Sequence, residues 1–279
     1  MAVRAYHNGD LGDVVRVWNA HHGPRAGVAV TGAQVQMLVL GSPGFTHADV
    51  TVHVDDSGRV DGWVHRVGDV AAMLAIDPAG SAHAAELLDA AGVTAFGPTP
   101  ADAGGYLGVS PLTAGGGYPA DDEAVAASLR SGGWSVEASF TTSAIPVRGY
   151  RPPVNRELLQ LRRTAPVTFV ESPAEDPERA AATAHLDRHV ATLPGGEDRI
   201  EIFRPDCEAA AVVGRHAVLR RPVSSPPDAR LTHVVSAAIG ELAGECFEEL
   251  WFATPGDDAG SLPPLPGAEI RWVGHRWQR

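Results

Sequence analysis

The chain has 279 residues, 44% of them hydrophobic, and a formal net charge of −12, which suits one large or two medium-sized globular domains. The acidic balance argues against nucleic-acid binding, which needs a basic surface, and no run of 18 apolar residues predicts a membrane segment. All 22 basic residues are arginine, so mechanisms that need a catalytic lysine or a Walker A lysine are excluded. The two cysteines, Cys207 and Cys246, form no CxxC motif, and we expect reduced thiols in a cytoplasmic protein.

The first half alternates helical and strand patterns. Residues 8–23 repeat apolar side chains at helical spacing and predict an amphipathic helix capped by Asn8 or Asp10. Alternating patterns on both sides of Asp56-Ser57-Gly58 predict a β-hairpin. The other elements expected in this half are strands at 70–77, 93–99 and 134–147 and helices at 80–92 and 121–133.

A similar order returns after residues 148–166, which we interpret as a linker with one short helix. The elements expected there are strands at 167–171, 199–206, 209–223 and 249–255, and helices at 176–193 and from Pro227 to about 245. The repeated order predicts two copies of one α/β unit, at 1–147 and 167–279.

The order β-α-β-β-β-α-β in each half resembles the GCN5-related N-acetyltransferase (GNAT) superfamily, and the whole chain is similar to its tandem two-domain members. In that family the fourth strand enters a Pro-x-x-(Arg/Gln)-x-x-Gly-x-(Gly/Ala) loop. Pro227 and Arg230 match its spacing, whereas His233 and Val235 stand at the glycine positions. The first half fits less well, with alanines at these positions and a shortened turn. The resemblance implies an α/β (α+β) fold of two domains, each a twisted, mostly antiparallel sheet flanked by helices.

The resemblance also implies acetyl-CoA, or another acyl-CoA, as co-substrate. We expect no metal. The pyrophosphate would lie on helix amides of the second half, with Arg230 beside it. The residues predicted to contact the coenzyme are Val223, Arg230, Leu231, Thr232, His233, Val234 and Val235. We expect Arg204, Arg215, Arg220 and Arg221 to surround the same loop. The alternative is that Pro226-Pro227 only stiffens an ordinary turn between strand and helix.

The implied reaction is acyl transfer to a primary amine of a small molecule or a peptide N-terminus. The family's acidic tyrosine is missing, since Leu129 stands at its place in the first half. Glu201 and His216 are the candidate bases, and each is alternatively an ordinary polar strand residue. His185 and His189 have the spacing of a helical metal pair but no third ligand. The alternative function is a non-catalytic GNAT-derived protein that binds a ligand or partner; the oligomeric state is left open.

Overall fold

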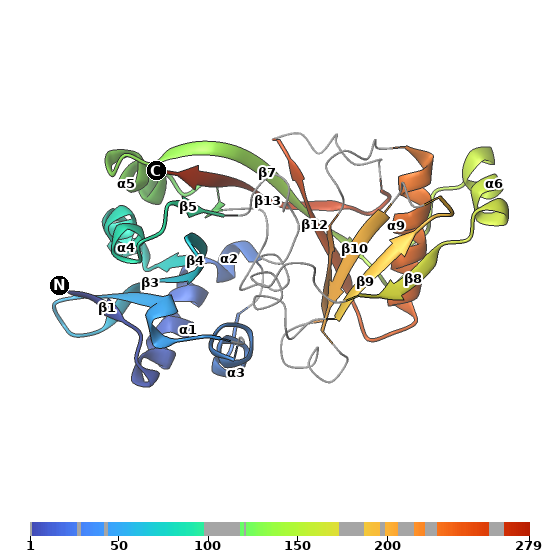
Figure 1. Ribbon diagram of the computed structural model, residues 1–279. Coiled ribbons are helices and arrows are strands. Elements are labelled where there is room, and N and C mark those ends of the chain that lie inside the picture. The colour runs from blue at the N-terminus through green and yellow to red at the C-terminus, as the bar shows by residue number, and fades with distance from the viewer. Residues whose placement is uncertain are drawn as a thin grey trace.

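The computed structural model describes residues 2–26, 29–41, 44–97, 118–119, 121–172, 187–195, 199–205, 215–220, 228–256 and 265–279. The fold is α+β, with a mixed sheet flanked by helices, as the sequence predicted, but the strands of both halves form one continuous sheet where one sheet per half was expected. Figure 1 shows the two halves side by side, joined by the long strands β7 and β13. No helix in the described ranges is long and apolar enough to cross a membrane.

The first half contains the amphipathic helix and the hairpin that the sequence predicted. Its elements are β1 (Ala2–Ala5), η1 (Asn8–Asp10), α1 (Leu11–His21), α2 (Gly23–Ala26), α3 (Gly32–Val35), η2 (Gln36–Leu40), η3 (His47–Asp49), β2 (Val50–Val54), β3 (Val60–Val67), β4 (Val70–Ile76), η4 (Pro78–His83), α4 (Ala84–Ala90), β5 (Ala95–Phe96), β6 (Tyr118–Pro119), α5 (Glu123–Ser131) and β7 (Ser135–Pro146). In the hairpin turn Gly58 has φ +84°, a conformation that glycine adopts without a Cβ clash, and the Asp55 carboxylate accepts bonds from the amides of Ser57 and Arg59.

The second half repeats the pattern around one long helix. Its elements are α6 (Arg156–Thr164), β8 (Thr168–Glu171), β9 (Asp187–Thr192), β10 (Arg199–Arg204), β11 (His216–Arg220), α9 (Ala229–Ala243), β12 (Glu249–Pro255) and β13 (Glu269–Gln278). The predicted linker 148–166 is packed rather than extended, because Leu158 of α6 is buried and Tyr150 and Ala165 lie against the core beneath α9.

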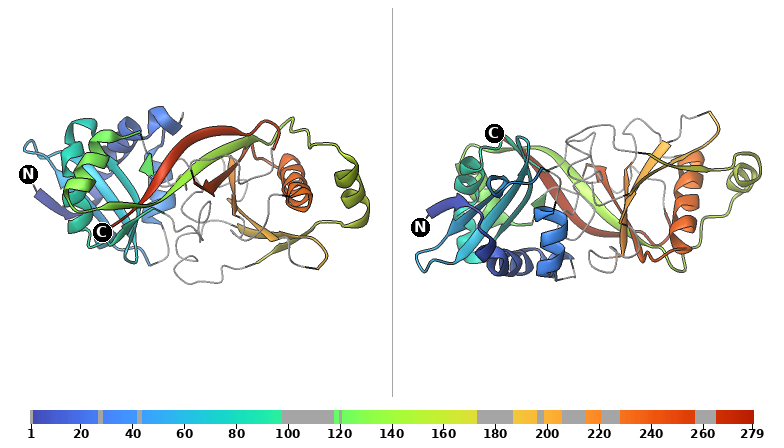
Figure 2. Two further views of the ribbon diagram at one scale, coloured as in Figure 1. Left: turned by 90° about the horizontal axis from the view of Figure 1, so that it is seen from above. Right: turned by 60° about the horizontal axis from the view of Figure 1, so that its bottom comes forward.

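The strand order is β1-β2-β3-β4-β5-β13-β7-β12-β11-β10-β9-β8. Among the described strands, β4–β5 and β11–β12 pair in parallel, each across a connection that contains a helix, and the other pairs are antiparallel. The two views of Figure 2 agree that β7 and β13 run together between the halves. Each half therefore completes its sheet with a strand from the other: β13 lies next to β5, and β7 lies next to β12.

This exchange places part of the predicted domain 167–279 in the sheet of the first half, and the boundary itself stays a prediction. Trp277 of β13 is 1% exposed and belongs to the core under α4 and α5 in the first half, together with Leu88 and Trp134. The opposite face of the first-half sheet packs on α1 through Trp18 and Trp63. By sequence order β13 belongs to the second half, but its Trp277 packs in the core of the first half.

Two further predictions were wrong. The helix expected at 176–193 is a strand in its described part, because residues 187–192 form β9 between β8 and β10. His189 is therefore a strand residue, and its predicted helical partner His185 lies outside the described residues. Cys246 is disulfide-bonded, and the chain has only one other cysteine, Cys207, also outside those residues. The cysteines thus give no argument for a reducing compartment.

Candidate active site

The start of α9 is where the sequence predicted the coenzyme. Asp228 is the N-cap: its carboxylate accepts from the Leu231 amide at 3.0 Å, and its carbonyl accepts from the Thr232 amide at 3.0 Å and the Thr232 hydroxyl at 2.9 Å. Such a cap satisfies amides that would otherwise point at a ligand. A bound phosphate would therefore have to compete with a carboxylate of the same charge sign.

The side chains that follow face the core. Leu231, Thr232, Val234 and Val235 are buried beneath the helix. His233 is also buried, and its Nε2 lies 3.0 Å from the carbonyl oxygen of Ala165, so its ring bonds the predicted linker. Arg230 is half-buried in the first turn of α9, and Val223 lies outside the described residues. Of the predicted contacts, Arg230 alone combines a charge with a place at the helix start.

The arginines expected around this loop do not all lie there. Arg204 ends β10 and pairs with Glu245, just past the C-terminal end of α9. Arg215 precedes β11 and lies 3.6 Å from Glu248. Both are at the end of β11 away from its turn into α9, because β10 and β11 are antiparallel. Arg220 ends β11 on the α9 side, and Arg221 is outside the described residues. Sequence proximity misled the prediction for Arg204 and Arg215.

Glu201, one candidate base, is a buried ion-pair residue. Its Oε1 accepts from the Arg188 guanidinium, which is also buried, and from Arg199 at 2.9 Å. Buried carboxylates are commonly paired in this way, because a lone charge in the interior is costly. The geometry is that of a structural ion pair on β9 and β10.

His216, the other candidate base, has a more suitable environment. Burial lowers the pKa of its imidazole, against the opposing effect of Glu249 and Glu248, so the ring is neutral at pH 7 and can accept a proton. Its Nδ1 lies 3.5 Å from Glu249 Oε2 but forms no hydrogen bond within the described residues, whereas Glu249 accepts from Trp251 Nε1 at 2.7 Å and from Arg271 at 2.6 Å. The carboxylate is therefore held by Trp251 and Arg271 and not by the imidazole.

The structure does not bring the two candidate bases together. Glu201 faces Arg220 in the β10–β11 register, and His216 lies four residues earlier on β11. At about 3.3 Å per residue the two are separated by roughly 13 Å along the strand. The buried side chains of Phe203 and Val218 lie between them. Glu201 and His216 therefore cannot act on the same proton.

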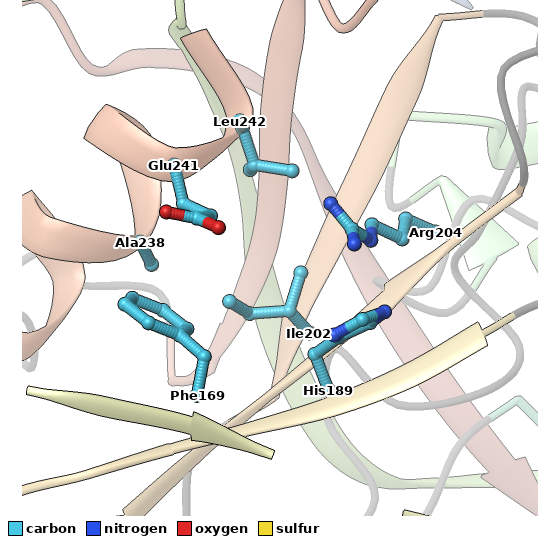
Figure 3. Close-up of a pocket in the computed structure, with 7 residues that line it drawn as sticks. All are labelled: Phe169, His189, Ile202, Arg204, Ala238, Glu241 and Leu242. Atoms are coloured by element: carbon cyan, nitrogen blue, oxygen red, sulfur yellow. The ribbon is translucent and has the colours of Figure 1, made fainter. Parts of the chain in front are cut away.

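A small pocket lies on the other face of the second-half sheet, between α9 and strands β8 to β10. Figure 3 shows Glu241 and Leu242 of α9 facing Ile202, Arg204 and His189 from the strands. Burial and the Arg204 cation lower the pKa of His189. The pocket has room for little more than a water molecule and lies at the C-terminal end of α9. It is too small, and at the wrong end of the helix, for a coenzyme.

Two histidines of the first half bond the edge of β4, in the part of that strand that extends beyond its pairing with β5. His21 Nδ1 accepts from the Ile76 amide at 2.8 Å, and His22 Nε2 lies 2.8 Å from the Leu74 carbonyl. His21 Nε2 in turn lies 2.9 Å from the Asp122 carboxylate. In the sequence these two histidines fall at the end of the helix predicted at residues 8–23. Their bonds to β4, more than 50 residues away, have no local signal.

No family model matches the chain, and no curated protein matches its sequence. Solved structures match its whole length. They include a GCN5-related N-acetyltransferase from Sphaerobacter thermophilus (10% identity, TM-score 0.63, 95% of that chain covered) and a tandem GNAT protein from the clavulanic acid biosynthesis pathway (12%, 0.51, 98%). Another is the GCN5-related glucosamine N-acetyltransferase region of a fungal multi-domain GH3 β-N-acetylglucosaminidase (14%, 0.62), of which this chain spans 38%. The fold is that of the GNAT acetyltransferases, in a tandem arrangement.

Proposed function

We propose that the chain is an acyl-CoA-dependent N-acyltransferase whose coenzyme site is at the start of α9. The observation that carries the proposal is the parallel β11–β12 pair with α9 in its connection. In open α/β sheets, ligands bind beyond the carboxyl ends of such strands, and helix amides there attract anions. Arg230 adds a guanidinium at this place, suited to a phosphate.

The proposed reaction is direct attack of a primary amine on the thioester carbonyl. The new C–N bond forms as the C–S bond breaks, the amine loses a proton, and the coenzyme leaves as a thiolate that is then protonated. Backbone amides would polarise the carbonyl. The neutral His216 imidazole is the better base of the two candidates. It begins β11, four residues or roughly 13 Å before Arg220 at the α9 end, so a chain of several water molecules would have to carry the proton.

The acceptor we propose is a small-molecule amine or a peptide N-terminus. Residues 1–147 carry 6 arginines and 15 acidic residues, a net charge of −9, whereas residues 148–279 carry 16 and 19, a net charge of −3. A cationic amine is attracted to the more acidic half, and a polyanionic coenzyme is repelled less by the second. This charge asymmetry supports the assignment of the coenzyme to α9.

A second function, non-catalytic binding of a ligand or partner, is favoured by the Asp228 cap. The cap occupies the Leu231 and Thr232 amides that a pyrophosphate would use. Glu201 is held by Arg188 and Arg199, so it is poorly placed to serve as a base. In this alternative the chain has the same fold but does not catalyse acyl transfer.

Calorimetric titration with acetyl-CoA separates the two functions, followed by detection of free thiol with a panel of amines. Arg230→Ala should weaken coenzyme binding about ten- to a hundredfold, because a charge-assisted phosphate contact contributes about 1.5–3 kcal/mol. Arg215→Ala is the matched control, with the same charge change at the other end of β11, and should bind normally. Absence of any binding by the wild-type chain refutes the enzyme proposal; binding without thiol release supports the alternative.

A further inference from the structure

A cluster of histidine and carboxylate side chains lies at the start of α4 in the first half, away from α9. His53 is on β2, Asp61 on β3, His83 ends η4, and Glu86 is in the first turn of α4. His53, His83 and Glu86 each place a ligand atom within 4.8 Å of the others. Strands and helix thus bring together three residues that are up to 33 positions apart in sequence.

His53 is oriented by a carboxylate. Its Nδ1 lies 2.5 Å from Asp61 Oδ1, and its side chain is 2% exposed. Gly80 lets the η4 turn close over this pair, since a Cβ there would lie 3.2 Å from Asp61 Oδ2. A carboxylate bonded to one ring nitrogen is the arrangement that holds a metal-binding imidazole in the correct tautomer, with the other nitrogen as the ligand.

The other nitrogen of His53 is not hydrogen-bonded by the described residues. No atom of the described part of the chain bonds the buried Nε2. With Nδ1 protonated and donating to Asp61, Nε2 carries a lone pair that no hydrogen-bond donor of the described residues approaches. Buried polar atoms are almost always satisfied, so an unsatisfied one beside other ligand atoms is a candidate for metal binding. Its lone pair can donate to a metal cation.

His83 and Glu86 supply the other ligand atoms from the exposed side. His83 Nδ1 lies 3.4 Å from Glu86 Oε2, close to the roughly 3.3 Å between two ligands of a tetrahedral zinc ion with bonds of about 2.0–2.1 Å. The His83 ring stacks on His53 with centroids 4.5 Å apart, so it must turn for both lone pairs to converge. His83 is 30% and Glu86 63% exposed, and both can move by the required distance of about 1.5 Å at most.

We propose that His53 Nε2, His83 Nδ1 and Glu86 bind a divalent zinc ion, with Asp61 as the residue that orients His53. Two imidazoles and a carboxylate are a ligand set that zinc favours, with water in the fourth position. The bound ion links the start of α4 to strand β2. The proposal departs from the expectation of no metal, which considered His185 and His189 as the candidate ligands.

The test is titration of the full-length chain, stripped of metal and freed of any histidine tag, with zinc alone in competition with a chromophoric chelator. We expect one equivalent to bind saturably and to raise the melting temperature. Loss of an outer carboxylate commonly costs about 10–100-fold in affinity, so Asp61→Asn should weaken binding by that factor, and His83→Ala or Glu86→Gln by at least about 100-fold. The positions of His83 and Glu86 on the surface let these variants fold without metal.

Two control variants carry the same chemical changes elsewhere: His7→Ala, exposed before α1, and Glu123→Gln, 80% exposed on α5. Both should bind zinc like the wild type. Cobalt, as a spectroscopic substitute, should give the visible absorption of a four-coordinate site that His83→Ala abolishes. The proposal is overturned if no equivalent binds, if His83→Ala and Glu86→Gln bind normally, or if His7→Ala loses as much affinity as His83→Ala.

Discussion

Truncation of Trp277 should destabilise the first half of the chain, although this residue follows the whole second half in sequence. Its indole is 1% exposed in the core under α4 and α5, beneath the Arg130 guanidinium at 5.8 Å. An indole that buries about 200 Å² at about 25 cal/mol/Å² contributes about 5 kcal/mol. Alanine retains part of that burial, so Trp277→Ala should lower the free energy of unfolding by about 3–5 kcal/mol.

Urea unfolding measures the size of this effect, and amide hydrogen exchange measures its place. Protection should fall in β4 and α4, because they share the core with Trp277, and less in α9. Ile270→Ala is the matched control on β13, since Ile270 is 58% exposed, and should change stability by less than about 0.5 kcal/mol. Exchange that accelerates in α9 while α4 stays protected would refute the strand exchange.

Three other predictions follow from the environments of single side chains. Burial lowers the pKa of His65 to about 4, below its usual 6.5, so its contribution to stability is present above pH 6.5 and is lost as the pH falls toward 4. Urea unfolding should show that the free energy of unfolding falls by about 2 kcal/mol between pH 7 and 5. His65→Gln should lack this loss, and the His7→Gln control should retain it. Asp228→Asn keeps a hydrogen-bond acceptor at the cap but removes its negative charge, so calorimetry should show that the affinity for acetyl-CoA rises about two- to fivefold. A lower affinity would contradict the proposed site. Arg188→Met should lower the free energy of unfolding in urea by about 3–5 kcal/mol, because it leaves Glu201 underpaired. The double variant with Glu201→Leu should regain most of that free energy. A double variant as unstable as Arg188→Met would contradict the ion-pair assignment.

Local patterns were sufficient to predict most elements. The helix at Leu11–His21, the hairpin around Gly58 and the helix at Glu123–Ser131 all have capping or turn residue types next to a periodic apolar run, although Asp10 makes no side-chain cap bond to the first helix. The stretch 176–193 was predicted to be a helix from its Asp-Pro start, but its described part pairs with β8 and β10, and this tertiary pairing overrides helix propensity. The strand at Glu269–Gln278 was not predicted at all.

The candidate sites were less predictable, because they depend on distant partners. Asp228 could be identified as a helix cap from its residue type, but the bond from His233 to Ala165 could not, since 68 positions separate them. Arg204 and Arg215 are near the loop in sequence and far from it in the sheet. The cluster of His53, His83 and Glu86 has no sequence spacing typical of a metal motif, because three elements contribute to it.

The exchanged strands also determine when each half can finish folding during synthesis. Ribosomes add about 5–20 residues per second, so β13 emerges about 6–25 s after β7, from which it is separated by 123 positions. Until then the edge of β5 is unpaired and the core beneath α4 lacks its indole. An open edge and an incomplete core promote association between nascent chains. For this fold, chaperone demand should therefore depend on translation speed across the second half.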